Sequence, residues 1–148
     1  MQVNFGGVES LSTVDYPEHP CMTIFLRGCG LRCPWCHNKE LQCGETFVDT
    51  EVIYSLMCEA MDFIEAVVFS GGEPLDQIEA VREMAFDAHT LGLLVGIHTA
   101  QPDKLKELPE LVDYAWIADP HIHPAQPGSH RAIWYDHGGE TISSRGKN

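Results

Sequence analysis

Residues 21–36 read Cys21-Met-Thr-Ile-Phe-Leu-Arg-Gly-Cys29-Gly-Leu-Arg-Cys33-Pro-Trp-Cys36. The first six residues are rich in apolar side chains, which predicts a buried strand over 21–26. This strand leads directly into three cysteines with the spacing C-x3-C-x2-C. Because proteins often carry their chemistry on loops that a rigid strand positions, the cysteine loop is the first candidate site.

Predicted strands alternate with predicted helices along the rest of the chain. This pattern favours an α/β fold with a parallel sheet and right-handed crossovers. The 148 residues hold four or five β/α units, too few for a closed eight-stranded barrel. We therefore expect one domain, residues 1–148, built as a partial, laterally open (β/α) barrel with a mostly parallel sheet. The strands are expected at 3–5 (before a turn at Gly6-Gly7), 21–26, 66–70, 93–97 and 114–118, and the helices at 51–62, 78–91 and, more weakly, 102–111. Residues 120–148, rich in Pro, His and Gly, are expected to form an irregular C-terminal segment.

The composition excludes several functional classes. A net charge of −13 with only nine Lys and Arg argues against a nucleic-acid partner, because phosphate binding needs clustered basic side chains. No apolar run approaches the ~20 residues of a membrane span, and the N-terminus lacks a secretory signal pattern. We therefore expect a cytoplasmic protein without a membrane partner, in which grouped cysteines indicate metal or redox chemistry.

The cysteine loop supplies three thiolates and no fourth. A structural zinc or a closed iron–sulfur cluster takes four protein ligands, whereas three thiolates around a 4Fe–4S cluster leave one iron open to a substrate. The spacing favours this cluster. It also allows a zinc site that takes His37 or Cys43 as a fourth ligand, or a redox C-x-x-C pair.

A second motif, Gly71-Gly72-Glu73-Pro74, follows the predicted strand 66–70. In a parallel sheet the carboxyl ends of the strands share one edge, where ligands bind, so this segment is expected beside the cysteine loop. The glycines would let the backbone approach a ligand, and Glu73 is suited to accept a hydrogen bond from an ammonium group. An ordinary strand-to-helix turn is the alternative.

The two motifs in this order, with Trp35 before the last cysteine, resemble the radical S-adenosylmethionine (SAM) superfamily over roughly residues 20–120. The resemblance implies a 4Fe–4S cluster on Cys29, Cys33 and Cys36, with SAM chelating the open iron. It also implies reductive cleavage of SAM to methionine and a 5′-deoxyadenosyl radical, which abstracts hydrogen from a substrate. The cofactor contacts that it implies are Trp35, Ser70, Gly71, Gly72, Glu73, Pro74, His98 and Thr99.

Two further segments select a subgroup. Residues 12–17, Ser-Thr-Val-Asp-Tyr-Pro, and residues 36–41, Cys-His-Asn-Lys-Glu-Leu, resemble the activases of glycyl radical enzymes, in particular those of anaerobic ribonucleotide reductase and pyruvate formate-lyase. This resemblance implies that the substrate is a glycine of a partner enzyme. It also implies an external one-electron donor such as flavodoxin or ferredoxin.

Two other functions stay open. One is a small-molecule radical enzyme related to 7-carboxy-7-deazaguanine synthase, whose cluster loop runs into an Asp-Thr pair where this chain has His37-Asn38. The other is a non-catalytic zinc-binding module.

Several isolated residues give weaker signals. Asp119 either lines the cofactor cavity or caps a loop, and a plain turn is favoured for Asp15. Dispersed cysteines are expected to be small buried hydrophobes rather than ligands of a second cluster; these are Cys21, Cys43 and Cys58. The histidines of the C-terminal segment, including His121 and His123, are expected to be solvated.

Overall fold

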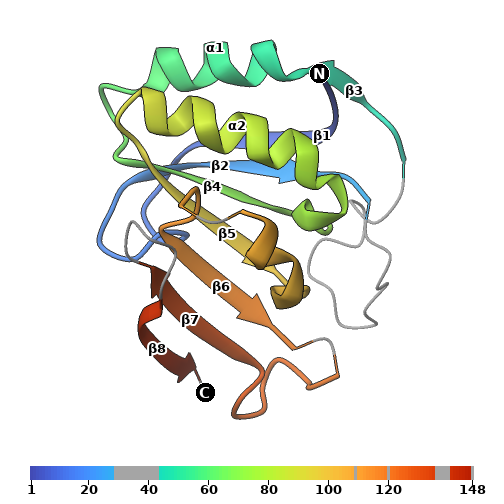
Figure 1. Cartoon of the computed structure of the whole chain (residues 1–148), viewed down its shortest axis with the longest axis vertical. Helices are drawn as coiled ribbons and strands as arrows, with labels where there is room; N and C mark the ends of the chain where they lie inside the picture. Colours follow the sequence, from blue (N-terminus) through green and yellow to red (C-terminus); the bar gives the residue numbers. More distant parts are fainter. Residues whose placement is uncertain (29–43, 109, 120, 136–140, 148) are drawn as a thin grey trace.

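The computed structural model of the protein describes residues 1–28, 44–108, 110–119, 121–135 and 141–147, the last of these by backbone alone (Figure 1). The strands are β1 (Gln2–Ser12), β2 (Cys21–Leu26), β3 (Phe47–Asp49), β4 (Ala66–Gly71), β5 (Leu94–Thr99), β6 (Tyr114–Ala118), β7 (His130–Tyr135) and β8 (Thr141–Lys147). The helices are α1 (Thr50–Ala60) and α2 (Ile78–Thr90), with the 3-10 helices η2 (Pro74–Gln77) and η3 (Pro102–Glu107).

The strands form one sheet in the order β3-β1-β2-β4-β5-β6-β7-β8. Its centre, β2-β4-β5-β6, is parallel, as the alternation of strands and helices predicted. Antiparallel strands extend the sheet at both sides, β1 and β3 beside β2, and β7 and β8 beside β6. Within the described residues β3 and β8 are the two edges, so the expected laterally open α/β architecture is confirmed.

The C-terminal part of the chain differs from the expectation. Residues 130–135 and 141–147 are strands rather than irregular structure. β7 pairs with β6 in a register that places Tyr114 opposite Trp134 and Ala118 opposite His130. This pairing joins segments that a Pro- and Gly-rich connection separates, and such a pairing leaves no local signal in the sequence.

Two other boundaries also differ. The turn predicted at Gly6-Gly7 is absorbed into β1, because the pairing with β2 shifts register between Phe5 and Gly7 and lets the strand continue. The weak helix predicted over 102–111 is the 3-10 helix η3, which ends at Glu107.

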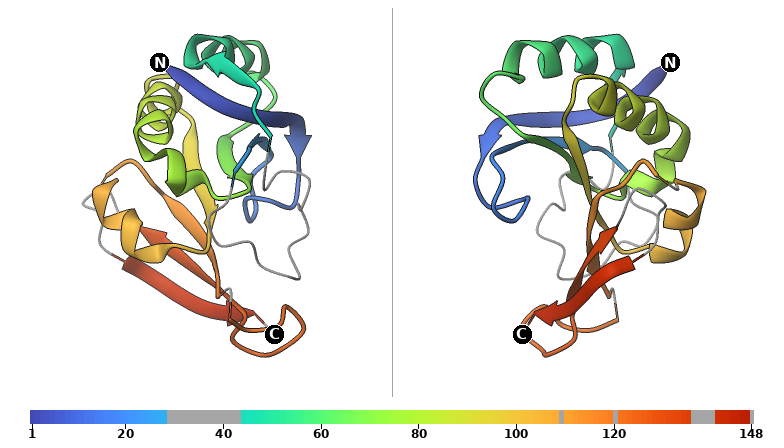
Figure 2. Two further views of the ribbon diagram at one scale, coloured as in Figure 1. Left: turned by 90° about the vertical axis from the view of Figure 1, so that its right-hand side faces the viewer. Right: turned by 60° about the vertical axis from the view of Figure 1, so that its left-hand side comes forward.

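Helices cover one face of the sheet. α1 is capped at its N-terminus by Asp49, whose carboxylate accepts a hydrogen bond from the amide of Glu51. Alternate strand residues, such as Met22 and Ile24 on β2 and Phe69 on β4, pack against α1 and α2 in the main core. Figures 1 and 2 show the two helices side by side, with β7 and β8 at the opposite end of the sheet. Within the described residues no helix is long and apolar enough to cross a membrane.

The other face of the sheet carries a smaller core. Tyr16, from the connection between β1 and β2, is buried there against Tyr114, with ring centroids 5.0 Å apart. Gly96 of β5 makes room for this pair, since a Cβ atom there would lie 3.0 Å from the Tyr16 ring and 3.2 Å from the Tyr114 ring. Ser70 and His98 lie on the same face, nearer the carboxyl ends of their strands.

Candidate functional site

The segment after β4 is joined to the end of β2, as the two motifs predicted. The amide of Gly72 donates to the carbonyl of Leu26 (2.8 Å), and the amide of Glu73 donates to the carbonyl of Gly28 (2.8 Å). Gly28 is the residue directly before Cys29. The Gly71–Pro74 turn therefore lies against the base of the cysteine loop, at the carboxyl edge of the parallel strands.

Gly71 is required by this close approach. Its φ of +110° is a conformation that L side chains rarely adopt. A Cβ atom at this position would also overlap the carbonyl oxygen of Leu26 and lie 2.5 Å from the amide nitrogen of Leu26. The absence of a side chain thus lets β4 end directly against the backbone of β2.

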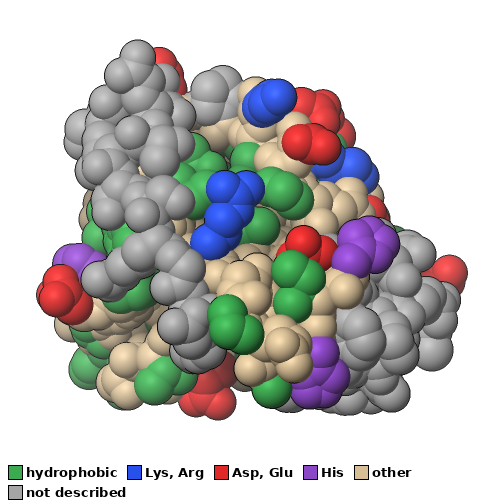
Figure 3. Space-filling model, turned by 90° about the horizontal axis from the view of Figure 1, so that it is seen from below, with side chains coloured by type: hydrophobic (Ala, Val, Ile, Leu, Met, Phe, Trp, Pro, Cys, Tyr) green, Lys and Arg blue, Asp and Glu red, His purple; other side chains and the backbone are tan. Residues whose placement is uncertain are grey.

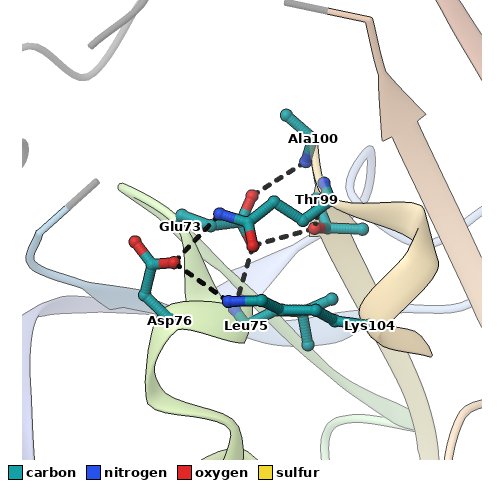
Figure 4. A network of polar contacts seen from close by, with 7 residues as sticks. Glu73, Leu75, Asp76, Thr99, Ala100 and Lys104 are labelled. Atoms are coloured by element: carbon teal, nitrogen blue, oxygen red, sulfur yellow. Dashed lines mark hydrogen bonds and ion pairs between the residues drawn. The ribbon is translucent and has the colours of Figure 1, made fainter. Parts of the chain in front are cut away.

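The carboxylate of Glu73 ties the same turn to β5 (Figure 4). Oε2 accepts from the Leu75 amide (2.9 Å) and the Thr99 hydroxyl (2.8 Å), and Oε1 accepts from the Ala100 amide (2.8 Å). The side chain is 1% exposed, and this burial raises the pKa of Glu73 against the opposing effect of its three donors. All three of these donors are groups of the chain itself, which indicates a positioning role for Glu73; its role as an acceptor for an ammonium group stays a prediction.

Pro74 and Thr99 take part in the same arrangement. Pro74 is buried at the start of η2. The Thr99 oxygen, besides donating to Glu73, accepts from the amide of Gln101 (2.9 Å). The ends of β4 and β5 are therefore one connected unit.

Ser70 and His98 form a second polar group, on the inner face of the sheet, which is the face that carries Tyr16 and not the helices. The Ser70 hydroxyl lies 3.3 Å from His98 Nδ1, and His98 Nε2 lies 3.1 Å from the carbonyl oxygen of Asp15. A carbonyl only accepts, so Nε2 carries the proton and Nδ1 accepts from Ser70. Burial lowers the pKa of His98, which keeps the ring neutral.

Asp15 holds the connection between β1 and β2 over this face. Its Oδ2 accepts from the hydroxyls of Ser12 (2.8 Å) and Thr23 (2.7 Å). The turn interpretation of Asp15 fits its bond to Ser12. The sequence did not predict that its carbonyl would accept from His98.

The predicted cluster ligands Cys29, Cys33 and Cys36 lie outside the described residues, as do Trp35 and Cys43. Of the remaining cysteines, Cys21 is fully buried, as expected, whereas Cys58 on α1 is only partly buried. The described residues contain no group of three or more His, Cys, Asp or Glu side chains suited to a metal ion.

Asp119 lines a pocket at the end of β6, whose walls also include Ala100, the residue that donates to Glu73. The pocket has a volume of about 380 Å³, and its walls include Ile117, His121 and Arg131. Figure 3 views the molecule from the side on which β6 and β7 lie and shows basic, acidic and histidine side chains among hydrophobic ones. Arg131 lies on β7, a strand that the sequence analysis did not predict. The pairing of β6 with β7 brings it to the pocket.

Comparison with known proteins decides the family. The family model described as the radical SAM superfamily matches residues 23–123, which include both motifs. The chain belongs to the radical SAM superfamily.

The relatives of this radical SAM protein include activating enzymes. It is 36% identical over 129 residues to a protein of Methanocaldococcus jannaschii named as a glycyl-radical enzyme activating enzyme, a match that covers 79% of this chain and 50% of the relative. It is 35% identical over 99 residues to the pyruvate formate-lyase-activating enzyme of Clostridium pasteurianum, covering 63% and 40%. The chain thus spans about half the length, or less, of these relatives.

The fold is similar to that of a solved structure. QueE from Escherichia coli matches with a TM-score of 0.53 at 18% identity, covering 67% of this chain and 52% of that one. At this identity the likeness concerns the fold alone, and it supports the partial, open α/β architecture of the radical SAM protein.

Proposed function

We propose that this radical SAM protein activates a glycyl radical enzyme. A 4Fe–4S cluster would be held by Cys29, Cys33 and Cys36, and SAM would bind beside it against the Gly71–Pro74 turn. When bound, the cluster supplies the electron that cleaves SAM to methionine and the 5′-deoxyadenosyl radical, which takes a hydrogen atom from a glycine of the partner. That electron would come from an external donor such as flavodoxin or ferredoxin.

The residues present fit this cluster and cofactor. Three thiols on one short segment are a suitable donor set for a cluster with an open iron. The segment starts at Gly28, whose carbonyl accepts from the Glu73 amide, so the turn and the cysteine loop begin side by side. This backbone junction is the observation that carries the proposal.

Each described residue of the candidate site has a role in the proposed function. The backbone of Gly71 and Gly72 offers the close approach to the methionine part of SAM, and Glu73 and Thr99 hold that backbone in place. Ser70 and the neutral ring of His98 line the inner face, where they would orient the cofactor without adding charge. Pro74 starts the 3-10 helix that ends the turn.

Two features support an activase over the alternatives. The relatives that the chain matches are named as activating enzymes, and the chain's own segments at 12–17 and 36–41 resemble that subgroup. The sheet is open at its sides within the described residues, which suits a substrate that is a loop of another protein. A small-molecule radical enzyme and a zinc-binding module remain the competing functions.

The first experiment separates an enzyme from a metal-binding module. Protein reconstituted under anaerobic conditions is analysed for iron, sulfide and zinc, then reduced and incubated with SAM. We expect about four irons and four sulfides per chain and the formation of 5′-deoxyadenosine. One zinc without sulfide, or no cleavage of SAM, would refute a radical enzyme.

The second experiment tests the substrate. The reduced protein and SAM are mixed with candidate glycyl radical enzymes, including an anaerobic ribonucleotide reductase and a pyruvate formate-lyase. We expect the electron paramagnetic resonance (EPR) doublet of a glycyl radical in one partner, and its loss when the partner's glycine is replaced by alanine. Cleavage of SAM without a glycyl radical in any partner would favour the small-molecule enzyme.

A further inference from the structure

Both ends of the cysteine-bearing segment 29–43 lie beside the same strand. The segment leaves β2 after Gly28 and returns through Gly44 to β3. β1 lies between β2 and β3 in the sheet, so the two ends are about two strand spacings, or roughly 10 Å, apart. A residue on β1 at this level can therefore contact both ends.

Asn4 makes these contacts. Its backbone carbonyl accepts from the amide of Arg27 (2.9 Å), on the outgoing side. On the returning side its side-chain Nδ2 donates to the carbonyl of Gly44 (3.0 Å), and its Oδ1 accepts from the amide of Thr46 (2.7 Å). One residue thus fixes the chain on both sides of the segment.

Gln77 connects Asn4 to the turn that follows β4. Its Oε1 accepts from the Asn4 amide (2.8 Å), and its Nε2 donates to the carbonyls of Asn4 (3.2 Å) and Arg27 (3.0 Å). The amide has one possible orientation here, because it faces one backbone donor and two backbone acceptors. Gln77 ends η2, the helix that starts at Pro74, so it links the turn to the base of the cysteine loop a second time.

We propose that Asn4 and Gln77 form a clamp of positioning residues, which holds the residues that flank the cysteine segment, Arg27 and Gly44, in a fixed position relative to the Gly71–Pro74 turn. The inference rests on the proposed function, in which the segment holds the cluster and the turn contacts SAM. Reacting groups held by separate segments need placement within about 0.5 Å, and hydrogen bonds from a second layer of residues usually provide it. The clamp supplies such bonds from residues 73 positions apart in the chain.

The test compares Gln77→Ala with a matched control, Gln101→Ala. Gln101 also donates to the η2 segment, to Asp76 Oδ1 (2.9 Å), but makes no described contact with Asn4, Arg27 or Gly44. Thermal unfolding of the metal-free proteins, iron per chain, and the EPR spectrum of the reduced cluster during a SAM titration are measured for both variants. We expect Gln77→Ala to keep its iron but to need about ten-fold more SAM for the shifted EPR signal, because the variant loses all three hydrogen bonds of the Gln77 side chain to Asn4 and Arg27. Gln101→Ala should titrate like the wild type.

Two isosteric variants keep the test decisive if Gln77→Ala folds poorly. Gln77→Glu retains the acceptor for the Asn4 amide but sets a carboxylate oxygen against two carbonyls. Asn4→Asp retains the acceptor for Thr46 but loses the donor to Gly44. Both should weaken the SAM response more than Gln101→Ala does.

The outcomes separate this inference from the proposed function. If the wild type binds a cluster and cleaves SAM while the clamp variants titrate like Gln101→Ala, the clamp is refuted and the proposed function stands. If the wild type assembles no iron–sulfur cluster, the proposed function fails and the clamp fails with it.

Discussion

Replacement of Gly71 by alanine tests whether the close approach of β4 to β2 determines stability. Two costs add at this position. An L residue at a positive φ costs about 1–2 kcal/mol, and forcing a methyl group into filled space costs about 1–3 kcal/mol more. The Cβ atom would stand 2.5 Å from the Leu26 nitrogen, far inside the ~3.5–4.0 Å of an ordinary contact, and backbone cannot rotate away as a side chain can. We therefore expect Gly71→Ala to lower the free energy of unfolding by about 2–5 kcal/mol.

Gly92→Ala isolates the steric part of this cost. Gly92 also has a positive φ, +78°, but a Cβ atom there would meet nothing within 4 Å. Urea unfolding of the metal-free proteins, followed by circular dichroism, gives both free energies. Gly92→Ala should lose about 1 kcal/mol, so the difference between the variants measures the overlap with β2. Equal losses would show that β4 and β2 do not approach each other as described.

Three further outcomes follow from the same site. Cys33→Ala should abolish cluster assembly, read as iron per chain, while far-ultraviolet circular dichroism keeps most of the wild-type α/β signal; a variant that still cleaves SAM would contradict the ligand assignment. Gly72→Val should raise the Kd for SAM without loss of iron, because a branched side chain would enter the space facing the cofactor, and an unchanged titration would count against that placement. Because burial lowers the pKa of His98, folding loses stability as the pH falls below 6.5, the ordinary value; His98→Gln should flatten this part of the stability–pH curve, and an unchanged slope would show that His98 is not buried as a neutral ring.

The central strands could be predicted because their signals are local. The apolar runs 21–26 and 114–118 coincide with β2 and β6, and the capping signal at Asp49 coincides with the start of α1. β7 was missed although Ile133, Trp134 and Tyr135 are strand-forming residues. It begins with His130 and Arg131, and its stability comes from pairing with β6 and from stacking of the His130 ring on Trp116, contacts that exist only after folding.

The candidate site was also predictable only where its signals are local in the sequence. Its segments were predictable, because the sequence rules for parallel sheets place the loops after β2 and β4 at one edge. The hydrogen bonds of Glu73 to the neighbouring strand were not predictable. The sequence alone does not show whether a carboxylate in a glycine-rich turn faces a ligand or the neighbouring strand. Asn4 and Gln77 were not predicted either, since single amides show no periodicity and belong to no motif.

The position of β1 determines the spacing of the described residues on either side of the cysteine segment. Ordering the backbone of a segment costs about 1–2 kcal/mol of conformational entropy per residue, which contacts with the rest of the protein must offset. Here β1 separates β2 from β3, and Asn4 joins the chain on both sides through backbone and side-chain bonds. We therefore include the antiparallel strand β1 in the proposed site, because it lies between the residues that flank the cysteine segment, Arg27 and Gly44, while Gln77 ties Arg27 to the turn after β4.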